Sequence, residues 1–436
     1  MTAAEGPARC RYPYPVIVVP GITGTDLVDQ YPLPPETVWN PLIKAFDRSA
    51  PHPDNLMYEA AEPARVGASQ IFAIAYRELV EELRYNLRPA ADLPVPVYPF
   101  GYDWRRPLES IEDQLGDFIE EVIERTQLLR HYHDGGYLDD ARVNLVGHSL
   151  GGILIAGYLA RTGASARVNK VMTLGTPYQG SFESVLKVTT GTASLGGPSP
   201  SSREREAARL TPSLYYILPS LADGLTVDPG LPASLYDPRV WQPSVVGSIA
   251  EYIRTRGIVP PRDAQQLFTH LLTQGQAHYR MLQDFRLDQA NLEPGRWLAI
   301  AGANATTRVH LKVVLRGGQP DFVFSSEDRQ NHWGDPDPRI ARVTGDGTVP
   351  LESAIPPFLK AENVVVVTDQ DFGYWELADQ ALVQFTDLHS MLPNMDMLQR
   401  LAVRFFAGQP DLHENTWGRR VPGVRDWQPP LPLQEK

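Results

Sequence analysis

Six short runs of apolar residues recur along the chain, and most of them lack the alternation of apolar and polar positions that marks a half-exposed strand. Uninterrupted apolar runs of this length are typical of parallel strands that are buried on both faces. We therefore predict strands at Val16–Val19, Val97–Phe100, Val143–Val146, Lys170–Leu174, Trp297–Ala301 and Asn363–Val367.

Between these runs the apolar residues change to helical spacing. In residues 108–122, apolar side chains recur every three or four positions and would line one face of a helix. The same spacing predicts helices over 76–87, 153–161, 263–285 and 395–406. Strands that alternate with helices predict an α/β fold, in which a mostly parallel, doubly wound sheet is covered by helices on both faces.

Two long segments interrupt this alternation. Residues 26–69 are rich in Pro and Asp, and we predict that they form a lid-like excursion. Residues 183–294 are predicted to form an inserted cap over the strand ends, where open α/β sheets bind ligands; an interaction domain with no role at the site is the alternative. The core is then divided into 14–182 and 295–410, and a tail of 411–436 follows.

Composition and charge exclude several classes of function. The chain has 436 residues and a net charge of -12, which argues against a nucleic-acid partner and gives no electrostatic attraction to anionic membranes. The N-terminus lacks the apolar core of a signal peptide, and no stretch approaches the length of a membrane span. Cys10 is the only cysteine, so no intrachain disulfide can form. We therefore predict a soluble, cytoplasmic protein; export by a route that needs no signal peptide is the alternative.

The strand predicted at 143–146 leads directly into a Gly-x-Ser-x-Gly pattern at 147–151, and a predicted helix follows. A strand, a sharp turn that carries Ser, and a helix together form a nucleophile elbow. Because the turn is tight, we expect that a Cβ at Gly147 or Gly151 would collide with the neighbouring strand or helix. The pattern predicts Ser149 as a nucleophile; the alternative is an ordinary serine in a glycine-rich turn.

A serine hydroxyl needs a histidine base, and the histidine needs a carboxylate that fixes its tautomer. On this architecture the chain order is Ser, acid, His. Asp346 lies in a Gly-flanked turn and is the predicted acid, although a plain Asp-Gly turn is the alternative. Of the histidines beyond it, His389 precedes the last helix and is the predicted base, whereas His413 follows that helix. The rival acids are Asp103, Asp371 and Asp387.

An oxyanion hole requires two N–H donors. The N–H of Leu150, directly after the nucleophile, is one predicted donor. The glycine-containing loop 20–24 follows the first strand and would supply the second from Ile22, or else from Thr23; a simple turn that closes the strand is the alternative. We expect no metal or cofactor, because residues 131–134 offer no clear third ligand cluster and no phosphate or dinucleotide loop occurs.

Several segments together resemble the lecithin:cholesterol acyltransferase family, which includes phospholipid:diacylglycerol acyltransferases and lysosomal phospholipase A2. The segments are Val18-Val19-Pro20-Gly21, Tyr102-Asp103-Trp104-Arg105, Gly147–Gly151, Leu174-Gly175-Thr176-Pro177, Pro212–Pro219, Gly345-Asp346-Gly347-Thr348-Val349 and His389. The resemblance covers about residues 16–408 and implies an α/β-hydrolase fold with a cap and a lid. It also implies that Ser149, Asp346 and His389 form a triad, with Ile22 and Leu150 at the oxyanion positions.

The chain departs from the extracellular members of that family, which have a signal peptide and a disulfide-closed lid loop. We interpret Asp103 and Arg105 as a structural pair beneath the site rather than as catalytic groups. Side chains of the first loop, the lid, the segment after the strand at 170–174 and the cap are predicted to contact the substrate. They are Thr23, Trp39, Tyr178, Leu214 and Tyr215.

In that family the serine attacks a lipid ester, holds the acyl group, and passes it to an alcohol or to water. We therefore predict a serine-dependent acyl-ester hydrolase or acyltransferase that works through an acyl-enzyme on Ser149. Its partner would be a lipid or another acyl ester, with peripheral membrane contact allowed. Two alternatives stay open: a hydrolase-fold binding protein without catalysis, and a thioesterase or esterase for a non-lipid acyl substrate.

Overall fold

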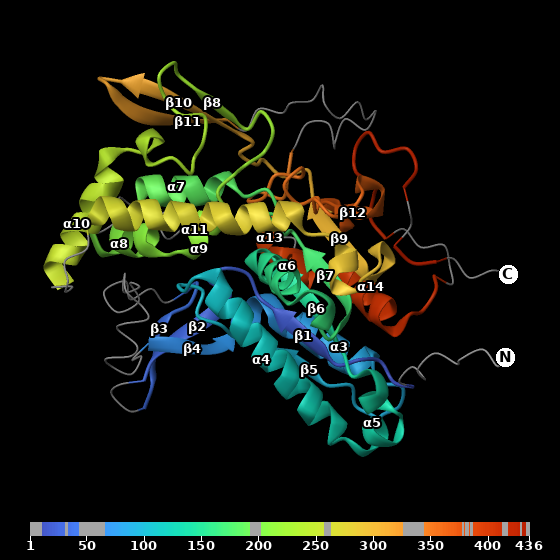
Figure 1. Ribbon diagram of the computed structural model, residues 1–436. Helices are drawn as coiled ribbons and strands as arrows, with labels where there is room; N and C mark the ends of the chain where they lie inside the picture. The colour runs from blue at the N-terminus through green and yellow to red at the C-terminus, as the bar shows by residue number, and fades with distance from the viewer. Residues whose placement is uncertain are drawn as a thin grey trace, which may run out of the picture.

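The computed structural model describes residues 11–30, 34–42, 66–191, 202–256, 263–325, 344–376, 379, 383, 387–411, 417–427 and 430–432. At its centre lies a six-stranded sheet in the order β12-β9-β7-β6-β1-β5, and every neighbouring pair is parallel (Figure 1). Its strands are β1 Val16–Val19, β5 Val97–Pro99, β6 Val143–His148, β7 Val168–Leu174, β9 Trp297–Gly302 and β12 Val364–Val367. Each predicted strand is present, and the parallel sheet is confirmed.

Alternate residues of the sheet face two separate apolar cores. Ile17 and Val19 of β1 belong to the core that contains the buried faces of α4 and α6, whereas Val16 and Val18 belong to the core of α3 and α14. These helices are α3 Ala73–Asn86, α4 Leu108–Gln127, α6 Leu150–Thr162 and α14 Asp396–Ala407. Because helices cover both faces of the sheet, the strand sequences are uninterrupted apolar runs.

A second group of elements extends away from one side of this sheet (Figure 1). Its helices are α7 Phe182–Thr190, α8 Ser202–Leu210, α9 Ser213–Tyr216, α10 Pro243–Arg256 and α11 Ala264–Asp284. Its three-stranded sheet, in the order β11-β10-β8, consists of β8 Leu225–Val227, β10 His310–Arg316 and β11 Gln319–Ser325. The sheet joins β8, which lies within 183–294, to two strands that follow this segment. The proposed division of the chain into core, cap and tail stays a prediction.

Helix α11 is fixed to the core helices by a buried polar contact. His278 Nε2 of α11 lies 2.6 Å from Glu112 Oε1 of α4, and both side chains are fully buried. Arg161 of α6 donates to the other carboxylate oxygen of Glu112 at 3.1 Å. The backbones of α11 and α9 also pack closely, since a Cβ at Gly275 would lie 2.2 Å from the carbonyl oxygen of Tyr215.

The described residues of the predicted lid form a small antiparallel sheet in the order β3-β2-β4. Its strands are β2 Thr25–Asp29, β3 Glu36–Trp39 and β4 Val66–Ile71, while residues 31–33 and 43–65 lie outside the described part. Arg105 donates to both carboxylate oxygens of Asp103, at 2.8 and 2.7 Å, and to the carbonyl of Val66 at 3.1 Å. The predicted structural pair is therefore confirmed, and it anchors β4.

The described parts of the C-terminal segment pack on the edge strand β12. Arg419 pairs with Val366 through backbone hydrogen bonds of 2.8 Å, and Trp427 Nε1 donates to the carbonyl of Val364 at 3.0 Å. Trp417 and Leu431 are buried. No helix in the described part of the chain combines the length and apolar character needed to cross a bilayer.

Helix α6 lies so close to β1 that one of its first residues has no room for a side chain. A Cβ at Gly151 would lie 2.2 Å from the carbonyl oxygen of Val19. A Cβ at Gly147, on the other side of the turn, would lie 2.7 Å from the backbone nitrogen of Gly152. The predicted collisions are confirmed, and they explain why both positions are glycine.

Replacing Gly151 by Ala should lower the free energy of unfolding by about 2 kcal/mol or more, because backbone atoms would have to move apart. Gly295→Ala is the matched control: nothing lies within 4 Å of a Cβ at that glycine. We expect the control to change stability by no more than about 0.5 kcal/mol. Urea unfolding followed by circular dichroism measures both variants, and equal destabilisation of the two would contradict the steric argument.

Candidate active site

Ser149 lies in the sharp turn between β6 and α6. Its φ of 53° and ψ of -123° fall in a region that residues with a side chain rarely adopt. The N–H of Ser149 donates to the carbonyl of Leu174 at 2.8 Å, which anchors the turn on β7. This conformation places the serine at the carboxyl end of β6 with 7% of its surface exposed.

The structure brings the nucleophile, base and acid that we predicted into one hydrogen-bonded chain. His389 Nε2 lies 2.9 Å from Ser149 Oγ, and His389 Nδ1 lies 2.7 Å from Asp346 Oδ2. His389 belongs to the short helix α13 Leu388–Met391, which follows β12, and Asp346 belongs to the turn that bridges to Ala305 after β9. All three side chains are buried, so water screens these contacts little.

Backbone groups hold the carboxylate of Asp346 in place. Its Oδ1 accepts hydrogen bonds from the N–H groups of Thr348 at 3.0 Å and Val349 at 2.7 Å. Its carbonyl oxygen accepts the N–H of His389 at 3.0 Å. Gly175, at the end of β7, has a φ of +55°, and a Cβ there would lie 2.9 Å from both Asp346 Oδ2 and His389 Nδ1. The glycine therefore leaves room for the pair.

Opposing influences set the pKa of His389. Burial lowers it, but the charge and hydrogen bond of Asp346 and the charge of Asp387 outweigh burial, so the pKa of His389 is raised above its ordinary value. The imidazolium that forms when His389 accepts a proton is thus stabilised where it forms.

The rival residues make other contacts. Asp387 caps α13 by accepting the N–H of Ser390 at 2.8 Å. Asp371 Oδ2 accepts the N–H of Thr368 at 2.8 Å. His413 lies outside the described residues.

Two buried tyrosine hydroxyls bind the loop after β1, and both contact the peptide group between Pro20 and Gly21. Tyr102 donates to the carbonyl oxygen of Pro20 at 2.8 Å, and the N–H of Gly21 donates to the hydroxyl of Tyr76 at 2.9 Å. A Cβ at Gly21 would lie 2.9 Å from Ser149 Cβ, so this loop packs directly against the elbow. Because the N–H of Gly21 is engaged, Ile22 is the next residue that can offer its N–H.

Leu150 is the first residue of α6, so its N–H has no carbonyl four residues earlier within that helix. Leu150 and Ile22 thus lie on the two segments that meet at Ser149. Thr23, which has a φ of 61°, donates from its hydroxyl to the carbonyl of Ile22 at 2.6 Å. The oxyanion role of these residues stays a prediction.

Most of the residues that we predicted to contact substrate are buried in packed cores. Trp39 packs against Trp104 with ring centroids 5.3 Å apart. Tyr178 donates to Thr173 Oγ1 at 3.1 Å within the core of the sheet. Leu214 and Tyr215 belong to the apolar core formed by α7–α11 and β10. These placements give the four side chains a packing role, and contact with a substrate stays a prediction for each.

The sequence does not indicate that two buried polar residues, Tyr76 and His148, belong to the site. Tyr76 occupies an inward position of α3, where a helical pattern expects an apolar residue, and His148 fills a variable position of Gly-x-Ser-x-Gly. Tyr76 Oη lies 2.8 Å from His148 Nδ1, and His148 Nε2 lies 2.9 Å from the carbonyl oxygen of His389. Spacing could not predict these contacts, because Tyr76 and His148 are 72 positions apart.

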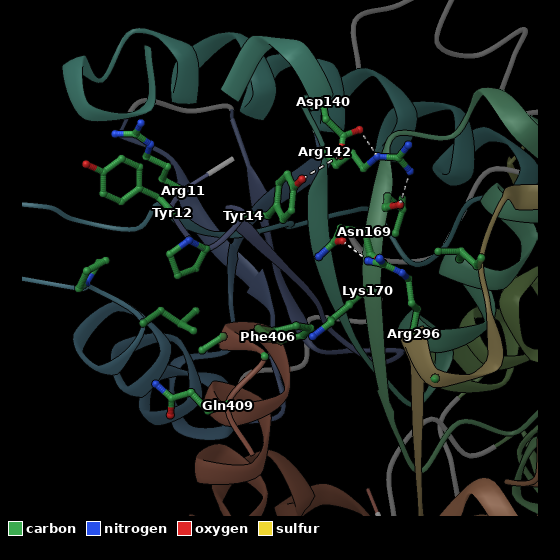
Figure 2. A pocket seen from close by; sticks show the side chains of 18 of the residues that line it. Arg11, Tyr12, Tyr14, Asp140, Arg142, Asn169, Lys170, Arg296, Phe406 and Gln409 are labelled. Atoms are coloured by element: carbon green, nitrogen blue, oxygen red, sulfur yellow. Dashed lines mark hydrogen bonds and ion pairs between the residues drawn. The ribbon is translucent and has the colours of Figure 1, made fainter. Parts of the chain in front are cut away.

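A cavity of about 1110 Å³ lies at the opposite, amino edge of the central sheet (Figure 2). Among the residues that line it are Tyr12, Tyr14, Arg142, Val168, Lys170 and Arg296. The six residues of β6 separate this edge from Ser149 by roughly 20 Å. Arg142 pairs with Asp140 at 2.6 Å, while Lys170 and Arg296 donate to the carbonyl of Phe405 and the side chain of Asn169. The cavity is thus separate from the candidate active site.

Comparisons with known proteins agree with this architecture. A family described as an alpha/beta hydrolase of unknown function (DUF915) matches residues 127–211, which contain the elbow. The structure resembles the crystal structure of a Tle4-Tli4 complex with a TM-score of 0.56 and 15% identity, over 79% of this chain and 89% of that chain.

A monoacylglycerol lipase of Paleococcus ferrophilus aligns at 13% identity over 87% of this chain and 97% of that chain, but the TM-score of 0.28 supports no argument. No curated protein sequence matches the chain. The parallel sheet, the family match and the first structural likeness together show an α/β-hydrolase fold.

The pKa values of the two neighbouring imidazoles should be shifted in opposite directions from the ordinary histidine value of about 6.5. We expect His389 to titrate above that value, whereas burial and the charge of His389 lower the pKa of His148 to about 3. In Asp346→Asn the pKa of His389 should fall, because the charge that offsets its burial is gone. NMR titration of ¹⁵N-histidine-labelled protein measures both rings, and a pKa of His389 below about 6.5 in the unaltered protein would refute this account.

Proposed function

We propose that this protein is a serine-dependent acyl-ester hydrolase or acyltransferase, of the lecithin:cholesterol acyltransferase type, that acts on a lipid-like ester. The observation that carries the proposal is the hydrogen-bonded chain from Asp346 through His389 to Ser149 at the carboxyl edge of the sheet. A neutral imidazole beside a serine hydroxyl, oriented by a buried carboxylate, is the arrangement that activates a serine nucleophile.

In the first half-reaction, Ser149 Oγ attacks the ester carbonyl carbon while its proton passes to His389 Nε2. The N–H groups of Ile22 and Leu150 stabilise the negative oxygen of the tetrahedral intermediate. The intermediate then collapses: the bond to the leaving alcohol breaks, the departing oxygen takes the proton from His389, and the acyl group remains esterified to Ser149.

In the second half-reaction, water or an alcohol attacks the acyl carbon and loses its proton to His389. Water gives a free fatty acid and an alcohol gives a new ester, and in both cases Ser149 Oγ regains its proton from His389. Asp346 stabilises the imidazolium in each half-reaction. Below the pKa of His389 the base is already protonated, so activity rises as pH increases through that pKa.

Apolar surroundings beside the nucleophile support an acyl substrate. Ile22 is partly buried and packs against both the core of the sheet and the apolar core of α7–α11. The loop that offers an oxyanion donor therefore lies at the junction of the two apolar cores, and such a junction suits a hydrocarbon chain with a reactive polar end.

The proposal is tested by labelling with a fluorophosphonate probe, which reacts with activated serines. Ser149→Ala should abolish labelling, because the proposed nucleophile is removed. Ser165→Ala is the matched control: its hydroxyl is exposed and donates to the carbonyl of Thr162 on the far end of α6, so labelling should be unchanged. Continued labelling of Ser149→Ala would refute the assignment.

Turnover of p-nitrophenyl esters of increasing acyl length then separates the open alternatives. A preference for long chains supports the lipid-like substrate, a preference for short chains favours a non-lipid esterase, and no turnover of any ester favours a binding protein. Products formed from a lipid extract with and without added alcohol distinguish hydrolysis from acyl transfer.

Exposed aromatic side chains support peripheral contact with a lipid surface. Tyr374 and Trp375 are 77% and 89% exposed, and their rings lie 5.2 Å apart. They belong to the segment between β12 and His389. This segment leaves the sheet at its carboxyl edge. Tyr and Trp are the residues that settle at the interface of a bilayer, because their rings combine apolar area with a polar group.

Trp375→Ser should reduce sedimentation of the protein with phosphatidylcholine vesicles by about threefold or more, because it removes an exposed aromatic ring. Leu128→Ser is the control: Leu128 is 80% exposed but lies at the end of α4, toward the amino edge of the sheet. This variant should bind vesicles like the unaltered protein. An equal loss of binding in both variants would argue against the proposed contact surface.

A further inference from the structure

Tyr76 and His148 are buried polar residues that the proposed mechanism does not use. With Gly21 and His389 they form a chain through four segments that are distant in sequence. The N–H of Gly21 contacts Tyr76 Oη at 2.9 Å, Tyr76 Oη contacts His148 Nδ1 at 2.8 Å, and His148 Nε2 contacts the carbonyl oxygen of His389 at 2.9 Å. The result is an unbroken chain of hydrogen bonds from the loop after β1 to the backbone of the proposed base.

The groups at the two ends of this chain, an N–H and a carbonyl oxygen, determine where its protons lie. A carbonyl oxygen can only accept a hydrogen bond, so His148 Nε2 carries a proton and donates a hydrogen bond to the carbonyl oxygen of His389. His148 Nδ1 is then an acceptor if the ring is neutral, and the hydroxyl of Tyr76 donates to it. The oxygen of Tyr76 remains free to accept the N–H of Gly21. Neutral His148 in this one tautomer satisfies every group in the chain.

We propose that Tyr76 and His148 are positioning residues that couple the loop bearing the oxyanion donor Ile22 to the base His389, so that the two halves of the site are held in place together. The inference rests on the proposed function. Tyr76 binds the Pro20–Gly21 peptide, which precedes the peptide that carries the N–H of Ile22, and His148 binds the carbonyl of His389. A shift at one end of the chain is transmitted to the other, because each link is buried and has one hydrogen-bonding arrangement.

A neutral ring at position 148 also suits the charge that develops during the reaction. The rings of His148 and His389 lie 4.9 Å apart, with an angle of 37° between their planes. Two imidazolium ions at this distance would repel each other strongly in a buried site. Burial and the charge of His389 lower the pKa of His148 to about 3, so His148 stays neutral when His389 becomes protonated.

Tyr102 provides a matched control for Tyr76. Both hydroxyls are buried, and both bind the same peptide: Tyr102 donates to its carbonyl oxygen, at Pro20, and Tyr76 accepts from its N–H, at Gly21. Of these two tyrosines, Tyr76 continues the chain to His148, whereas the hydroxyl of Tyr102 ends at the carbonyl oxygen of Pro20. Removal of either hydroxyl therefore loosens the peptide, but only removal of the Tyr76 hydroxyl breaks the chain to His389.

The test is a pair of double-mutant cycles on the full-length protein, with kcat and KM measured for an ester that the unaltered protein turns over. Tyr76→Phe and His148→Leu should each lower kcat by roughly 10- to 100-fold while KM changes little, since the reacting groups are misplaced but the substrate still binds. The double variant should be about as impaired as the worse single variant, because either change already breaks the chain. When Tyr102→Phe and His148→Leu are combined, their fold losses of kcat should instead multiply.

His148→Gln is the conservative variant, because its amide can still donate toward the carbonyl of His389, and it should recover part of the lost kcat. Thermal unfolding of each variant is measured alongside. Three results would overturn the inference: unchanged kcat in Tyr76→Phe and His148→Leu, multiplying effects in the Tyr76–His148 cycle, or losses of kcat that follow stability alone. Failure of the proposed function appears differently, as absence of ester turnover in the unaltered protein.

Discussion

The close approach of α6 to β1 and β6 is the contact on which the rest of the site depends. Glycines at 147 and 151 allow backbone to pack on backbone at this crossing, where a single Cβ would lie within 3 Å of main-chain atoms. The chain must then turn sharply between strand and helix, and Ser149 takes a positive φ as a result. Such a conformation costs on the order of 1–3 kcal/mol, and the buried sheet on either side of the turn maintains it.

Around that turn, the site is assembled from the carboxyl ends of parallel strands. The loop after β1 packs against Ser149, Gly175 at the end of β7 leaves space for Asp346 and His389, and His389 follows β12. Hydrogen bonds hold the two polar side chains beside Ser149: the carboxylate of Asp346 accepts backbone N–H groups, and His389 is held at both its ring and its carbonyl. Low local polarity strengthens these hydrogen bonds and makes any loss among them costly.

The elements that extend from the sheet are joined to it by polar as well as apolar contacts. His278 and Glu112 meet in a fully buried position, and a buried ion pair or hydrogen bond of this kind favours one register between packed helices. Ile22 lies where the two apolar cores meet. Together these features place an apolar environment next to a serine that lies in a strained turn, which is the physical basis for proposing an acyl ester as the substrate.

Local sequence determined much of this protein. Uninterrupted apolar runs located the six strands of the parallel sheet, helical spacing located the helices against it, and the Gly-x-Ser-x-Gly turn with the required chain order selected Ser149, Asp346 and His389, which the structure brings into hydrogen-bonding contact. Strands β8, β10 and β11 were not predicted. The pairing of β8 with β10 joins segments that are far apart in the chain, which local patterns do not record.

Only the tertiary structure decided that Tyr215 is buried in an apolar core, and that Tyr76 and His148 join the loop after β1 to the backbone of His389. Periodicity reports which face of an element is buried. The partner that a buried group meets depends on how strands are ordered and how helices cross, and the spacing of residues along the chain contains no record of either.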